Sequence, residues 1–177
     1  MGQIFTSLCH ARSIAIAWTC LCGSLVAEEQ EYRPTACVPV SQFRIAGLSM
    51  NDKVAIALQR FGKPTKVSES QSEDDGGPYR VVKYTFRDLE VDVGREQIER
   101  IASTKVGHSF AGDVRIGMEM SEVAERLRFH QWFAEEMVVV LTNCGAGSGL
   151  EAKLSFRASA DASAFTLWRI ELTGYGP

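Results

Sequence analysis

Histidine and cysteine are the side chains best suited to metal binding or covalent catalysis, and both are few. The chain of 177 residues holds three histidines and five cysteines. His108 and His130 have no second ligand three or four residues further on, and a zinc site needs several convergent nitrogen or sulfur ligands. A Cys–His nucleophile pair would require Cys37 or Cys144 as a free thiolate. We therefore predict no metal, no cofactor and no catalytic residue.

The glycine-rich run from Cys144 to Gly149 resembles a phosphate-binding loop at first sight. A P-loop requires Gly-Lys-Ser/Thr followed by a helix, whereas the strand-like residues 150–156 follow here. Ser148 does not lie in a Gly-x-Ser-x-Gly motif, because residue 146 is alanine. We predict a flexible hairpin loop in which Ser148 is a candidate contact for a partner.

The most polar stretch, residues 70–78, contains the acidic run Glu73, Asp74 and Asp75. These acids lack the alternating ligand spacing of an EF-hand calcium loop. No other pair of carboxylates is marked by its spacing as an acid–base pair. We predict a solvated hairpin or helix–strand loop, whose three acids are candidate contacts for a basic partner.

Three aromatic side chains have two alternative interpretations. Trp132 and Phe133 follow a predicted helix, and Trp168 lies in the last predicted strand. They either pack in the core or form an exposed aromatic anchor, the kind of side chain that dominates binding energy in interfaces. All three are retained as candidate binding residues.

The first 27 residues have the pattern of a cleavable signal peptide. Arg12 supplies a weakly positive start, and residues 14–27 form an apolar run too short for a comfortable membrane span. Ala27 then precedes the polar Glu28. This pattern predicts a periplasmic or secreted protein. A buried N-terminal helix is one alternative, and a lipid anchor at Cys20 or Cys22 is a less favoured one.

The predicted export changes the meaning of the cysteines. Cys9, Cys20 and Cys22 leave with the signal peptide, so Cys37 and Cys144 remain. An even pair in an oxidising compartment favours one disulfide, and two unpaired buried thiols are the alternative.

Composition sets limits on the class of partner. The net charge of −3 gives no electrostatic reason to expect nucleic acid. No later segment is long and apolar enough to predict a transmembrane helix. The favoured partner is therefore a protein.

Two similar helix starts predict a duplicated organisation. Residues 47–58 and 117–127 each begin with Gly, carry Met three residues later, and then show a polar residue, an acid and an apolar i, i+4 pair. Asn51 and Ser121 have the side chains expected at N-caps. Gly62 followed by Pro64 ends the first helix.

Three strand-like runs follow each predicted helix, because apolar and polar residues alternate with a period of two. The six predicted strands cover 79–86, 89–93, 97–103, 137–142, 150–156 and 165–173. The sequence thus predicts an α+β fold of two tandem α-β-β-β repeats with helices packed on antiparallel sheet. The predicted boundaries are a signal peptide at 1–27, an extended arm at 28–42, a first repeat at 43–106 and a second at 107–177.

These motifs resemble those of two families, the β-lactamase-inhibitory proteins and the small outer-membrane assembly lipoproteins of the SmpA/OmlA type. The resemblance rests on residues 47–58, 61–64 and 117–127, with the strand pattern extending it over about 43–173. It implies a shared fold and says little about function. The chain departs from the lipoproteins because it lacks a clean lipobox, and no inhibitory residue can be transferred to it.

Three functions follow in order of preference. The first is an exported, non-catalytic protein-binding module, more narrowly an inhibitor or immunity protein against a periplasmic or secreted target. The second is a structural accessory of envelope or outer-membrane assembly. The third is an unrecognised hydrolase.

Overall fold

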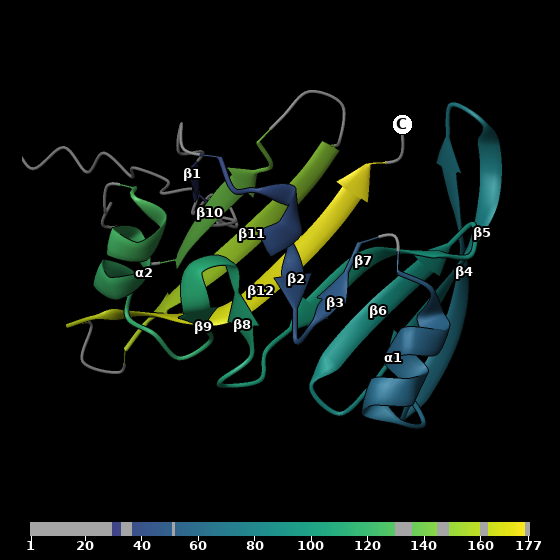
Figure 1. Ribbon diagram of the computed structural model, residues 1–177, viewed down its shortest axis with the longest axis horizontal. Coiled ribbons are helices and arrows are strands. Elements are labelled where there is room, and N and C mark those ends of the chain that lie inside the picture. The colour runs from purple at the N-terminus through teal and green to yellow at the C-terminus, as the bar shows by residue number, and fades with distance from the viewer. Residues whose placement is uncertain are drawn as a thin grey trace, which may run out of the picture.

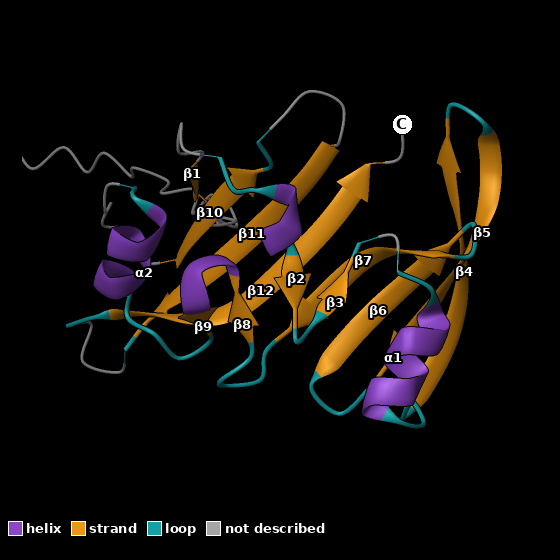
Figure 2. Ribbon diagram, in the orientation of Figure 1, coloured by secondary structure: helices purple, strands orange, loops and turns teal. Residues whose placement is uncertain are grey.

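An eight-stranded sheet dominates the computed structural model, which describes residues 30–32, 37–50, 52–129, 136–144, 149–159 and 163–175 (Figures 1 and 2). The strand order is β1-β10-β11-β12-β7-β6-β5-β4. All neighbours are antiparallel except β1, which runs parallel to β10. The strands are β1 (Gln30–Tyr32), β4 (Lys66–Asp74), β5 (Gly77–Thr85), β6 (Leu89–Gly94), β7 (Gln97–Ser103), β10 (Glu136–Thr142), β11 (Gly149–Ala158) and β12 (Phe165–Tyr175).

Short elements lie over one face of this sheet (Figure 1). They are the helices α1 (Val54–Phe61) and α2 (Met120–Leu127), the 3₁₀ turns η1 (Val40–Gln42) and η2 (Ala111–Asp113), and the ribbons β2 (Arg44–Ile45) with β3 (Leu48–Ser49) and β8 (Ser109–Phe110) with β9 (Val114–Arg115). The described helices are too short to cross a membrane.

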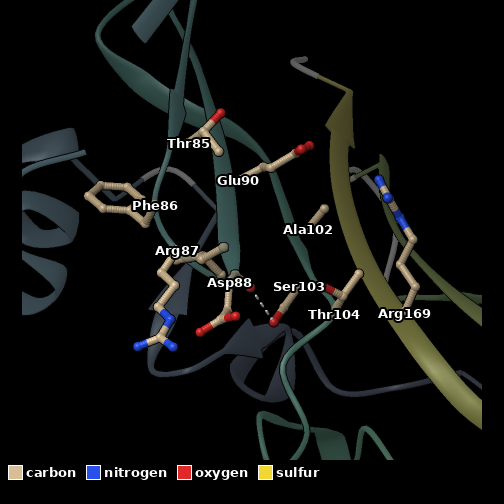
Figure 3. A pocket seen from close by; sticks show the side chains of 10 residues that line it. Thr85, Phe86, Arg87, Asp88, Glu90, Ala102, Ser103, Thr104 and Arg169 are labelled. Atoms are coloured by element: carbon tan, nitrogen blue, oxygen red, sulfur yellow. Dashed lines mark hydrogen bonds between the residues drawn. The ribbon is translucent and has the colours of Figure 1, made fainter. Parts of the chain in front are cut away.

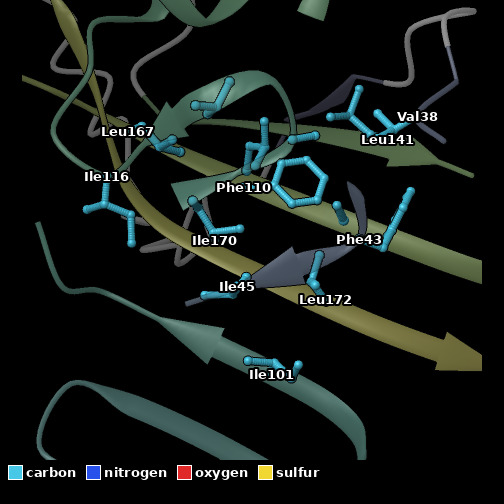
Figure 4. Close-up of a cluster of buried hydrophobic side chains, with 14 of the residues drawn as sticks. Val38, Phe43, Ile45, Ile101, Phe110, Ile116, Leu141, Leu167, Ile170 and Leu172 are labelled. Carbon is cyan, nitrogen blue, oxygen red and sulfur yellow. The ribbon is translucent and has the colours of Figure 1, made fainter. Parts of the chain in front are cut away.

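The hydrophobic core lies between the sheet and these short elements (Figure 4). Alternation explains it, because every second residue of a strand faces the same side. In β11, Leu150, Ala152, Leu154 and Phe156 are all buried. From the opposite layer, Phe43 meets Phe110 edge to face, with ring centroids 5.6 Å apart. Burial of apolar surface between the two layers is the main stabilising force here.

A disulfide joins the N-terminal arm to the end of β10, as predicted. Cys37 and Cys144 are bonded, with their Cα atoms 4.9 Å apart. The backbone continues the pairing around the bond. The Val38 amide donates to the Thr142 carbonyl at 2.9 Å, and the Cys144 amide donates to the Val38 carbonyl at 2.9 Å.

The six predicted strands are confirmed, with ends within two residues of those predicted. The predicted fold class, an α+β fold of two tandem α-β-β-β repeats, is wrong. The described part of the chain is mostly β, because its two α-helices have only eight residues each and its long strands all join one sheet. Four long strands follow α1, instead of the three that the repeat requires.

The additional strand is β4, which the sequence pattern did not predict. With β5 it makes residues 70–78 a hairpin, the first of the two alternatives predicted there, and not a helix–strand loop. Residues 70–74 complete β4, Asp75 and Gly76 form the turn, and β5 begins at Gly77. β4 is an edge strand whose residues are almost all polar and exposed. Without a buried face it shows no apolar alternation, so the pattern that identifies a strand is absent.

The helix starts also differ from the prediction. Ser121 is the second residue of α2, and Glu119 occupies the N-cap without a side-chain hydrogen bond. Asn51 lies outside the described residues. The end of α1 is as predicted, because Gly62 follows it with φ of 76°, a conformation that favours glycine.

The predicted signal peptide, including Cys20 and Cys22, lies outside the described residues. Export and the less favoured lipid anchor therefore stay predictions. Of the predicted arm, the structure describes β1 and residues 37–42, which include η1.

Candidate functional site

The face of the sheet that points away from the core carries charged side chains grouped around Arg100. In β6, Leu89, Val91 and Val93 face the core, so Glu90 and Asp92 between them face the other way. Arg100 on β7 lies opposite Asp92 in the strand register. Its Nη1 atom is 3.2 Å from Asp92 Oδ2 and 3.3 Å from Glu90 Oε2.

Glu171 on β12 extends this network across the next strand pair. Arg100 donates from Nε to Glu171 Oε1 at 2.9 Å and from Nη2 to Glu171 Oε2 at 3.0 Å, a two-pronged contact. Arg169 Nη2 also donates to Glu171 Oε2, at 2.7 Å. Lys83 on β5 lies 3.9 Å from Glu90. We call these six side chains the Arg100 cluster: Lys83, Glu90, Asp92, Arg100, Arg169 and Glu171.

Two β-bulges direct the arginines to this face. In β7, Ile98 and Arg100 pair with consecutive residues of β6, which leaves Glu99 as the extra residue. In β12, Leu167 and Arg169 pair with consecutive residues of β11, which leaves Trp168 as the extra residue. Such an insertion locally resets which side chains face which side.

The network keeps Arg100 and Glu171 charged. Burial alone would raise the pKa of Glu171, but hydrogen bonds from Arg100 and Arg169 outweigh burial and lower that pKa to about 2. Burial opposes the charge on Arg100, yet the hydrogen bonds and charge of Glu171, with Asp92 and Glu90, raise its pKa. Arg100 and Glu171 are consequently ionised throughout the physiological pH range.

The cluster still has unused hydrogen-bonding capacity. Asp92 Oδ1 and Thr173 Oγ1 are buried and have no hydrogen-bond partner among the described residues. Buried polar atoms are nearly always paired in proteins, so each exception needs a reason. Thr173 lies opposite Arg100 in the strand register, which places both atoms at the same cluster.

A small depression lies at the end of this face (Figure 3). Its volume is about 100 Å³, and its lining includes Glu90, Ala102 and Arg169. Ala102 faces Glu90 on one side and Glu171 on the other in the strand register, so the small side chain leaves the hollow between charged neighbours.

Trp168 flanks the cluster next to Arg169. It is half-buried and lies outside the main core. The Arg157 guanidinium lies 6.0 Å from the centroid of its ring, within the range of a cation–π contact. This position makes an aromatic surface available beside the charges, and its role in binding stays a prediction.

The predicted acidic residues lie elsewhere. Glu73, Asp74 and Asp75 are at the β4–β5 hairpin tip, and β4 is four strand spacings from β12, about 19 Å across the sheet. Asp74 accepts from the Gly76 amide at 2.8 Å and from Arg95 at 2.6 Å. The first of these bonds, aided by Arg95, lowers the pKa of Asp74.

The remaining predicted site residues, Trp132, Phe133 and Ser148, lie outside the described residues, as does His130. Across the described ranges, no three His, Cys, Asp or Glu side chains are grouped so that they could hold a metal ion.

Ser103 and His108 form a pair that the sequence did not suggest. Ser103 Oγ lies 2.7 Å from His108 Nδ1 and 3.0 Å from the Asp88 carbonyl, and it accepts from the Lys105 amide at 3.2 Å. These contacts fill the one hydrogen and two lone pairs of a hydroxyl. Ser103 is only 2% exposed. The pair therefore fastens the loop after β7 and does not present a nucleophile.

The Arg100 cluster was missed for a specific reason. Glu90, Asp92 and Glu171 each alternate with apolar residues, which marked them only as outward-facing. Contacts between them depend on strand order and register, which the sequence pattern does not contain. The sequence does contain an indication of the two bulges. Ile98 and Ile101 are apolar residues three apart within one strand, and so are Leu167 and Ile170; a regular strand would space core-facing residues by two, so the extra residue indicates a bulge.

No protein-family model matches the sequence, and no curated protein matches it. Among solved structures, a cysteine-rich secretory protein from Staphylococcus aureus subsp. aureus Mu50 is 14% identical, with a TM-score of 0.49 over 82% of this chain and 50% of that one. An extracellular protein containing a SCP domain, from Bacillus anthracis str. Ames, is 9% identical, with a TM-score of 0.39 over 82% and 48%. This chain spans about half the length of either structure. Similarity at these TM-scores carries no argument about its fold or function.

Proposed function

We propose that this chain is an exported, non-catalytic protein-binding module that holds a protein partner against the face bearing the Arg100 cluster and Trp168. The export part rests on the signal-peptide pattern of residues 1–27. The disulfide supports it, because disulfides persist in oxidising compartments. An inhibitor or immunity protein is the narrower form of this proposal, motivated by the resemblance of the helix motifs.

The observation that carries the proposal is the ordered state of the charged face. The side chains of Arg100, Asp92 and Glu171 are only 18%, 16% and 21% exposed, and cross-strand bonds hold them in place. These three side chains are already ordered, so binding of a partner to this surface would cost little of their conformational entropy. Trp and Arg are the residue types most enriched among those that dominate binding energy.

The arrangement also favours a polar partner of mixed charge. The cluster combines Lys83, Arg100 and Arg169 with Glu90, Asp92 and Glu171, so its formal charges cancel. Complementary charges on a partner would determine the orientation in which it binds more than they would increase its affinity.

Partner capture followed by quantitative binding tests this function. The disulfide-bonded chain is immobilised, proteins retained from culture supernatant and periplasmic extract are identified, and the dissociation constant of each is measured with purified components. Trp168→Ala, which removes the aromatic surface, and Arg157→Glu, which reverses a neighbouring exposed charge, should each weaken binding about tenfold or more.

Lys63→Glu is the matched control, because Lys63 is exposed just after α1. It should leave the affinity unchanged. The proposal fails if no protein binds, or if Lys63→Glu weakens binding as much as the two variants on the charged face.

A further inference from the structure

A groove of about 610 Å³ lies between the start of α1 and β5, on the face of the sheet opposite the Arg100 cluster. Val82 on β5 lines it and pairs with Val93 on β6. Val93 belongs to the core, so the groove is on the core-facing side of the sheet. It forms where α1 covers the sheet incompletely.

The floor of the groove is apolar and partly open to water. α1 fully buries only Ala57. Val54 at its start, and Val82 and Tyr84 on β5, stay half-buried and line the groove. When another apolar group displaces the water over such a surface, the free energy falls, so the surface favours binding of an apolar group.

The rim of the groove is mainly cationic. Lys53, Arg80 and Arg95 line it, together with one acid, Glu96. Arg80 is paired with Glu69 and Arg95 with Asp74. Lys53, in contrast, forms no ion pair within the described part of the chain, and no acid lies in the first turn of α1. An incoming carboxylate would therefore not have to displace an ion-pair partner of Lys53 from the residues that the structure describes.

The turn that carries Arg95 is strained. Arg95 and Glu96 have φ angles of 48° and 69°, in the left-handed region that residues other than glycine rarely adopt. The turn lines one end of the groove, whereas the Arg95 guanidinium lies 4.6 Å from the centroid of the Tyr79 ring, which by strand alternation points to the opposite face of the sheet. Strain of this kind concentrates at functional positions.

We infer that this groove binds an extended acidic segment of another protein. One apolar or aromatic side chain of that segment lies over Val82 and Tyr84, and a neighbouring carboxylate pairs with Lys53. The groove is open to solvent along one side, which suits a peptide better than a small molecule, because small-molecule sites enclose most of their ligand. This site is on the other face of the sheet and is independent of the function proposed above.

A defined peptide tests the inference. The probe is fluorescein-labelled Asp-Phe-Asp-Phe-Asp amide, with binding measured by anisotropy in low salt and located by amide chemical shifts. The wild-type chain should bind the probe, with shifts confined to Lys53–Ala55, β5 and the 95–96 turn. Lys53→Glu should weaken binding about fivefold or more, whereas Lys63→Glu, the same charge change near the other end of α1, should have little effect.

A second probe separates a groove from a general attraction between charges. In Asp-Ser-Asp-Ser-Asp amide the aromatic side chains are gone and the charge is kept, so its binding should fall by more than tenfold. Equal affinity for the two probes, shifts on Arg100 in β7 and on Arg169 and Glu171 in β12 instead of the groove, or no binding at millimolar protein would each overturn the inference.

Discussion

Arg100 connects side chains from three strands through one guanidinium group. The planar fork of arginine presents several N–H donors at fixed angles, so it can meet Glu171 with two bonds while it also reaches Glu90 and Asp92. A lysine has one ammonium and cannot reproduce this geometry. Three carboxylates therefore share Arg100, and among the described residues Glu90 and Glu171 each have one further cation, Lys83 and Arg169.

Replacing that residue should be costly. Arg100→Met leaves Glu90, Asp92 and Glu171 with Lys83 and Arg169 as their only cations in the cluster. We expect the free energy of unfolding at pH 7 to fall by about 2 to 3 kcal/mol, at or below the range for a fully buried pair because the cluster is partly solvated. Urea denaturation measures it. Arg80→Met is the control, because its pair with Glu69 is exposed and should contribute less than about 1 kcal/mol.

The same variant should change the acid dependence of stability. Folding lowers the pKa of Glu171 from 4.5 to about 2, so its contribution is complete above pH 4.5 and is lost as the pH falls towards 2. Wild-type stability should drop across this interval, and Arg100→Met should show a smaller drop. An unchanged acid profile would mean that Arg100 does not control the ionisation of Glu171.

The elements of the sheet differ in how clearly their sequence identifies them. β6 and β7 bury one face each, and their apolar alternation predicted them almost exactly. β4 has no buried face, so its Ser and Glu residues resemble a loop. The Arg100 cluster needs the order and register of β5, β6, β7 and β12 together, which emerge only when the sheet assembles.

The β6–β7 hairpin has a turn whose residue types do not suit its conformation. Two-residue turns of this kind favour Asn-Gly, because both central residues need positive φ. Here they are Arg95 and Glu96. The contacts of Arg95 with Asp74 and Tyr79 stabilise it in this conformation, whereas the Glu96 side chain is exposed.

Glu96→Gly should therefore stabilise the protein by about 1 kcal/mol, because it relieves the left-handed strain at φ of 69°. Thermal unfolding measures the gain. Glu96→Ala keeps a Cβ and should give none. A loss of stability in the glycine variant would show that the Glu96 side chain makes a contact worth more than the strain.

At the scale of the molecule, one covalent bond closes most of the chain into a loop. The sequence separation between Cys37 and Cys144 is 107. The pairing could be predicted from the cysteine count and the export pattern, but the backbone hydrogen bonds of Val38 with Thr142 and Cys144 beside it could not. The fold class was wrong at this scale because two helix-strand patterns were expected to form two similar units, and instead their long strands merged into one sheet.

The double variant Cys37→Ser, Cys144→Ser should lose about 4 kcal/mol of stability through the added entropy of the unfolded chain. Guanidinium denaturation with and without reductant measures it, and reductant should affect only the wild type. A loss below about 1 kcal/mol would mean that the unfolded chain is already restricted without the bond.

The same bond determines which part of the molecule carries a mechanical load. A pull on the segments that precede Cys37 and follow β12 passes directly from Cys37 to Cys144 and then along β11 and β12. Residues 38–143 lie inside the closed loop and bear no tension through the backbone. The peptide groove, together with Arg100 and its partners Glu90 and Asp92 on β6, would therefore keep its shape while the chain is stretched, whereas Glu171 on β12 lies in the loaded path.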